Sequence, residues 1–195
     1  METADASCAL NTRRPDADDD GETYPKEVRL KQRLSALLIT VAAGALPLAA
    51  HAADNVSAAD KAFVAMVSQG GMFEVKLGQL AAEQGGTQDI KDQGTTEAHD
   101  HQLVGDKLSA IAKAAGLPIA DSLNPEFQKK LDDLKALSGS AFDKAYLSAM
   151  VDIHHKDGAA FAEEAKSGAN PDLRAFAAET HRIVVRHLGE LQARP

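Results

Sequence analysis

The sequence predicts an all-α protein: a bundle of four long helices with one long crossover that carries a short extra helix. Helix-forming residues dominate the chain after residue 52, where Ala, Leu, Lys, Glu and Gln are abundant and β-branched runs are few. Apolar residues recur there at alternating spacings of three and four, the period of a buried helix face. Glycine and proline interrupt this pattern where helices would end.

Five helices follow from these signals. They are expected from Ser57 to about Gln84, from about Gln88 to Ala115, from Asn124-Pro125 to near Leu137, from after Ser140 to about Lys166, and from Asn170-Pro171 to the C-terminus. Short links make antiparallel hairpins of the first two and the last two long helices, whereas the crossover 117–139 joins the hairpins. One long crossover in a four-helix bundle is the ferritin-like arrangement.

An export signal is predicted in front of the bundle, at residues 26–52. A basic start (Lys26, Arg29, Lys31, Arg33) precedes the apolar run 34–50, and the run closes on the small-x-small site Ala50-His51-Ala52. These three parts in this order are the signature of a Sec signal peptide, and Pro47 favours cleavage over a retained anchor. We therefore expect a periplasmic or otherwise exported mature domain, residues 53–195, with no stable membrane span after cleavage.

Charge and cysteine content narrow the function of that mature domain. It carries 21 acidic and 15 basic residues, a net charge of −6, which argues against nucleic acid and anionic membranes as partners. The single cysteine, Cys8, lies in the acidic segment 1–25, which we expect to be disordered or to precede the true translation start. Disulfide and thiolate chemistry are thus excluded from residues 53–195, while a homo-oligomer or an envelope protein remains open as a partner.

Polar residues interrupt the apolar face of each long helix near its middle. The interruptions are Glu74 in the first helix, Glu97 and His101 in the second, His154 with Asp157 one turn later in the third, and His187 in the fourth. In each hairpin, the polar residues of the two helices lie at similar distances along the chain from the turn. At about 1.5 Å per residue, they therefore lie at similar depth in the bundle. The sequence therefore predicts carboxylates and imidazoles at one level of the core.

Buried carboxylates need compensation, and two kinds of compensation fit this pattern. A lone buried carboxylate costs several kcal/mol unless it is neutralised, paired or bound to metal. Imidazole nitrogen and carboxylate oxygen are ligands for transition metals, so a metal site is one interpretation. A metal-free network of buried Glu–His pairs is the other. Glycines near the same level would either leave room for ligands or allow close helix crossings.

Several sequence segments resemble an exported bacterial ferritin-like family known as domain of unknown function 4142. They are Met72-x-Glu74-Val75-x-Leu77-Gly78, Asp100-His101, Ser138-Gly139-x-x-Phe142-Asp143-x-x-Tyr146-x-x-x-Met150-Val151-x-x-His154, Phe176-Ala177 and His187-Leu188. The resemblance covers roughly residues 59–191. It implies a ferritin-like bundle behind a signal peptide, no established activity, and Glu74, His101, His154 and His187 as the matching polar positions.

The functional hypothesis is metal binding in the periplasm, for metal homeostasis or protection against oxidative stress. Glu74, His101, His154 and His187 would bind the ion directly, and Glu97 and Asp157 would be further ligands or orienting groups. The Glu-x-x-His pairs of di-iron ferritins are missing, so a site for iron, copper or zinc that is richer in histidine fits better. The alternative is a metal-free helical module for envelope stress or protein interaction, and the sequence leaves enzymatic activity undecided.

Overall fold

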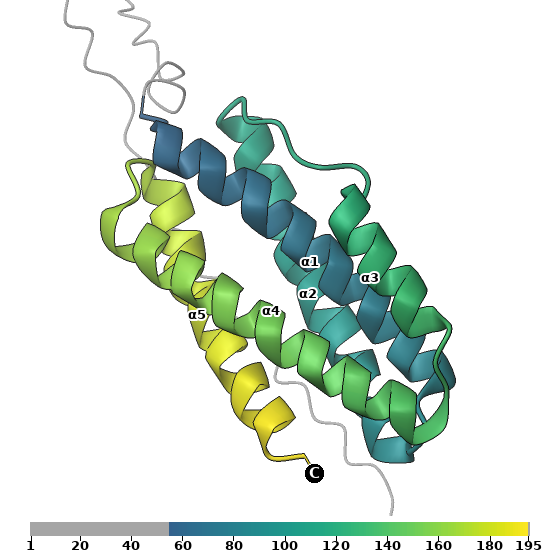
Figure 1. The fold of residues 1–195 in the computed structure, drawn as a ribbon. Helices are drawn as coiled ribbons and strands as arrows, with labels where there is room; N and C mark the ends of the chain where they lie inside the picture. The colour runs from purple at the N-terminus through teal and green to yellow at the C-terminus, as the bar shows by residue number, and fades with distance from the viewer. Residues whose placement is uncertain (1–54, 195) are drawn as a thin grey trace, which may run out of the picture. The chain divides into compact units, whose positions relative to one another are not determined.

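Residues 55–194 are described by a computed structural model, and this part of the chain contains five helices and no strand (Figure 1). The helices are α1 (Ala58–Gln84), α2 (Gln88–Ala114), α3 (Pro125–Lys135), α4 (Gly139–Ser167) and α5 (Pro171–Gln192). The predicted all-α class is therefore confirmed. The acidic segment 1–25 and the predicted signal 26–52 lie outside the described residues. A search of the described helices for an apolar stretch able to cross a membrane finds none.

Side-chain caps fix where four of the helices begin. Ser57 accepts a hydrogen bond from the backbone N–H of Asp60, whose carboxylate accepts one from the N–H of Ser57, as the capping box predicts. The side chains of Thr87, Asn124 and Asn170 accept backbone N–H groups at the starts of α2, α3 and α5, and a proline follows each asparagine. Every helix, including α4 without a side-chain cap, starts within two residues of its predicted position.

The long helices pack as two hairpins. α1 lies along α2 and α4 lies along α5, and the hairpins meet where α1 contacts α4 and α2 contacts α5. The short helix α3 packs against α1 and α4 on the outside of this group (Figure 1). The link from α2 to α3 runs past α1, where the side chain of Gln69 hydrogen-bonds the backbone of Ser122 and Asn124.

The apolar core is divided into two clusters along the helices. One cluster includes Phe63, Val67, Leu108, Phe161, Phe176 and Val184. The other includes Phe73, Leu77, Tyr146, Met150 and Leu191. On each long helix the polar interruptions predicted from the sequence lie at the boundary between the two clusters, and all of them are buried. A layer of buried polar side chains thus separates two apolar segments of the core.

The glycines of α1 and α2 fall into two structural classes. A Cβ on Gly94 would lie 2.6 Å from the carbonyl oxygen of Gly78, and a Cβ on Gly78 would lie 2.7 Å from the carbonyl oxygen of Gly94. These two residues therefore let the two backbones touch where α1 crosses α2. In contrast, a Cβ at Gly71 or Gly105 would meet no described atom within 4 Å. The close-crossing interpretation thus applies to Gly78 and Gly94.

Replacing Gly94 by alanine should destabilise the fold, because its methyl group would overlap backbone that cannot move aside. We expect Gly94→Ala to lower the free energy of unfolding by about 1–3 kcal/mol. The matched control on the same helix is Gly105→Ala, which should raise the free energy of unfolding by up to about 1 kcal/mol because alanine is the better helix former. Urea denaturation followed by circular dichroism measures both, and equal effects would contradict the proposed crossing contact.

Candidate metal centre

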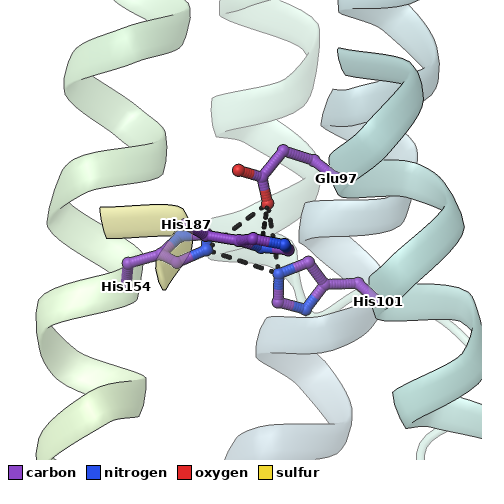
Figure 2. Close-up of side chains that lie close together, drawn as sticks. All are labelled: Glu97, His101, His154 and His187. Carbon is purple, nitrogen blue, oxygen red and sulfur yellow. Dashed lines mark hydrogen bonds and ion pairs between the residues drawn. The ribbon is translucent and has the colours of Figure 1, made fainter. Parts of the chain in front are cut away.

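Four of the six predicted site residues come together in the polar layer. Glu97 and His101 project from one face of α2, since they are four residues apart, and they meet His154 from α4 and His187 from α5 (Figure 2). Each contributes one oxygen or nitrogen atom to a group in which all atoms lie within 4.8 Å of one another. We call these four residues the His3Glu cluster. All four side chains are at most 3 % exposed.

The carboxylate of Glu97 is the centre of the His3Glu cluster. Its Oε2 atom lies 3.3 Å from Nε2 of His101, 3.4 Å from Nε2 of His154 and 2.9 Å from Nδ1 of His187. The two Nε2 atoms are 3.4 Å apart. Ligand atoms held at about 2.0–2.1 Å from a tetrahedral zinc ion are separated by about 3.4 Å. Most of the measured separations therefore match the edges of a tetrahedral coordination shell.

Two atoms of the cluster have no described hydrogen-bond partner, although both are buried. They are Oε2 of Glu97 and Nδ1 of His187, which face each other at 2.9 Å without the angles of a hydrogen bond. An unpaired buried carboxylate oxygen is costly, and a lone pair opposite it adds repulsion. A cation between these atoms would remove both costs, so the residues present fit a transition metal ion.

Neighbouring groups contact the outward nitrogens of His154 and His187. Nδ1 of His154 lies 2.9 Å from the carbonyl oxygen of Met150, which can only accept a hydrogen bond, so Nδ1 carries the proton. Nε2 of His187 lies 3.0 Å from Oδ2 of Asp100, and this oxygen also accepts from Arg186 at 2.5 Å. The inward Nε2 atom of His154 is then left with its lone pair, as metal ligation requires, whereas Nε2 of His187 also lies 3.0 Å from Nη2 of Arg186.

Glu74 lies behind the cluster rather than in it. Its carboxylate contacts Nδ1 of His101 at 3.1 Å and Nδ1 of His154 at 3.2 Å, the nitrogens that face away from Glu97. Burial, followed by the charges of Asp157 and Glu97, holds the pKa of Glu74 well above its ordinary value. We expected Glu74 as a direct ligand and Glu97 as a further ligand or orienting group; the structure places Glu97 among the three imidazoles and Glu74 against the Nδ1 atoms of two of them.

Asp157 is the predicted site residue that the structure sets apart from the cluster. Its carboxylate lies against Gly70, where a Cβ would come within 2.6 Å of Oδ2, and it lines a cavity between α1, α3 and α4. Burial raises the pKa of Asp157 to about 7, against the lowering influence of His154 and Lys156. Its charge therefore acts on Glu74 and on His154 of the cluster.

The charges within the cluster are strongly coupled. Burial by itself would raise the pKa of Glu97, but the imidazoles of His101, His154 and His187 close to its carboxylate outweigh burial and hold this pKa far below its ordinary value. Burial lowers the pKa of His101 despite the nearby Glu97. For His187 the balance is reversed, because Glu97 and Asp100 overcome burial and raise the pKa. Among the imidazoles of the cluster, His187 is thus the one whose protonated form is favoured by Glu97 and Asp100.

The sequence analysis missed one residue that holds Glu97 in place. The side-chain amide of Gln93 donates a hydrogen bond of 2.7 Å to Oε1 of Glu97, which leaves Oε2 to face the imidazoles. Gln93 is 3 % exposed and lies one turn before Glu97 on the same helix face. The spacing of four between residues 93, 97 and 101 was the signal that could have revealed it.

Comparison with known families agrees with this architecture. A family model, described as a domain of unknown function (DUF4142), matches residues 45–193. The chain belongs to this family. Among solved structures, it is similar to the crystal structure of a DUF305 fragment from Deinococcus radiodurans, with 13 % identity and a TM-score of 0.62 over 71 % of this chain and 95 % of that one. At this identity the likeness concerns the fold alone. No curated protein matches the chain.

The role of Glu97 as the counter-charge of His187 can be measured directly. In the metal-free DUF4142 protein, the His187 imidazole should titrate above the ordinary pKa of histidine. Glu97→Gln should shift this titration to lower pH, because burial and Arg186 would then oppose only Asp100. Asp100→Asn is the matched comparison and should shift it less. NMR titration of the imidazole resonances gives the answer, and an unshifted His187 in Glu97→Gln would contradict the assignment.

Proposed function

We propose that this DUF4142 protein is an exported ferritin-like protein that binds one transition metal ion in the middle of its helical bundle. The observation that carries the proposal is the His3Glu cluster, in which three imidazoles and one carboxylate from three helices converge within 4.8 Å in the buried core. Such donor sets suit zinc, copper or iron in preference to magnesium or calcium, which favour oxygen ligands.

The ligand set favours holding a metal over catalysis by it. A site with four protein ligands leaves a tetrahedral ion no open position, whereas catalytic zinc sites keep one position for water or substrate. The supporting groups favour the same role. Gln93, Asp100 and the carbonyl of Met150 each contact one member of the cluster, and Glu74 contacts two. We therefore infer a role in metal homeostasis, or in protection against metal-driven oxidative damage.

The ferritin-like arrangement and export are parts of the same proposal. Two hairpins joined by a long link that contains α3 support a ferritin-like topology. Export is supported by the basic start, apolar run and small-x-small site within residues 26–52. Full-length protein expressed in a bacterium should then be recovered from the periplasm with Ala53 at its N-terminus. Intact-mass measurement of the periplasmic fraction tests this, and recovery of uncleaved protein in the cytoplasm would refute it.

Metal content is the decisive measurement for the site. Protein purified from periplasm without chelator should contain one equivalent of a transition metal by mass spectrometry. Removing two of the four ligands in His101→Leu/His154→Leu should weaken metal affinity by more than about 100-fold, because loss of supporting groups alone typically costs 10- to 100-fold. The matched control is His99→Leu/His155→Leu, which replaces the exposed neighbours of the same two ligands and should bind like wild type.

The same variants separate metal binding from the metal-free alternative. Metal at about 100 times its Kd should stabilise the wild type by about 2.7 kcal/mol and leave the double ligand variant unchanged. If the wild type takes up no iron, copper or zinc, and apolar replacement of the pair leaves stability unchanged or raises it, the cluster is a structural network. The protein would then be an interaction module rather than a metal carrier.

A further inference from the structure

A cavity of about 600 Å³ opens beside the metal centre, between α1, α2 and the link that follows α2. Residues 119–123 of that link form one of its walls. Gln69 holds this wall against α1, because its amide donates to the carbonyl oxygen of Ser122 at 2.9 Å and accepts from the N–H of Asn124 at 2.8 Å. The cavity is therefore bounded by hydrogen-bonded backbone on the side of the link.

His101 connects this cavity to the His3Glu cluster. It is 3 % exposed, yet it lines the cavity while its Nε2 atom belongs to the cluster. Glu97, His154 and His187 line neither this cavity nor the smaller ones between α1, α3 and α4 and between α2 and α5. His101 is thus the ligand through which the cluster can be reached from this cavity.

The size of the cavity suits a hydrated cation, and polar groups lie among the apolar side chains of its lining. One water occupies about 30 Å³ in the liquid, so an ion with six waters needs on the order of 200 Å³ and fits with space to spare. The charged side chains on its lining include the carboxylates of Asp106 and Asp121 and the ammonium of Lys76, and polar groups of Ser68 and Gln102 lie among them. Hydroxyl, amide and carboxylate oxygens can exchange with the waters of a divalent ion.

We propose that this cavity is the entry route by which a hydrated divalent transition metal ion reaches the His3Glu cluster, with His101 as the first ligand that it meets. The inference rests on the proposed metal-binding function and adds the path by which the ion enters. Glu97, His154 and His187 complete the coordination after the ion has passed His101. Glu74 on α1 contacts Nδ1 of His101 and Nδ1 of His154, so it lies beside the ligand at the end of this route.

Two glycines offer a way to block the route without touching any ligand. Gly71 on α1 and Gly105 on α2 both line the cavity, and a Cβ at either would meet no described atom within 4 Å. Leucine at both positions would fill the cavity with side chain while improving helix propensity. Gly189 on α5 is the matched control, because a Cβ there also meets open space but the residue does not line the cavity.

The test is the rate of metal binding by Gly71→Leu/Gly105→Leu, followed by stopped-flow absorption with Co²⁺ as the probe. A blocked path slows association and dissociation equally, so we expect both rates to fall by about tenfold or more while Kd stays unchanged. Gly189→Leu should bind and release Co²⁺ at the wild-type rates. If circular dichroism shows that the double variant does not fold, each single replacement provides the same comparison.

The possible outcomes separate the route from the site. Wild-type rates in the folded cavity variants, with Co²⁺ bound at wild-type affinity, would overturn the entry route and leave the metal centre standing. A weaker equilibrium affinity without slower association would likewise overturn it, because the glycines would then act on the site. If wild-type protein binds no Co²⁺, Zn²⁺ or Cu²⁺ at equilibrium, the proposed function fails and the route fails with it.

Discussion

The buried carboxylate of Glu97 is the constraint on which the rest of the structure depends. A charged oxygen without exposure to water must be compensated, and three imidazoles from three helices lie around it at 2.9–3.4 Å. This requirement fixes the relative depth of α2, α4 and α5, because a shift of one helical turn would move a histidine by about 5.4 Å and leave the charge unpaired. Gln93 then fixes which oxygen faces the imidazoles.

The polar layer interrupts what would otherwise be a continuous apolar core. The two apolar clusters on either side of it are well packed, with Leu77, Tyr146 and Met150 fully buried in one and Val184 almost fully buried in the other. Apolar residues in the layer would satisfy packing at lower cost, since replacing buried ion pairs by hydrophobic groups is often neutral or stabilising. Two buried carboxylates and three buried imidazoles lie there instead, a donor set that can bind a ligand.

The surroundings of the layer are asymmetric in a way that suits a metal carrier. The cavity beside His101 and the link after α2 borders one ligand, whereas Glu97, His154 and His187 line none of the cavities described. Glu74 contacts the imidazoles of His101 and His154 through their Nδ1 atoms, as supporting carboxylates do in metal sites. Tight binding and exchange with solvent place opposite demands on a buried site. Here three members of the cluster are enclosed, and the fourth, His101, borders the cavity.

The sequence by itself determined the helices, their caps and the level of the polar layer, because these depend on local chemistry and on spacing along single helices. It also identified His101, His154 and His187, which the structure brings together. Only the tertiary structure decided that Glu97 joins them while Glu74 lies behind and Asp157 stands apart. The reason is that helix rotation about its own axis sets which of two neighbouring buried groups faces the centre, and that rotation follows from packing between helices, such as the contact of Gly78 with Gly94.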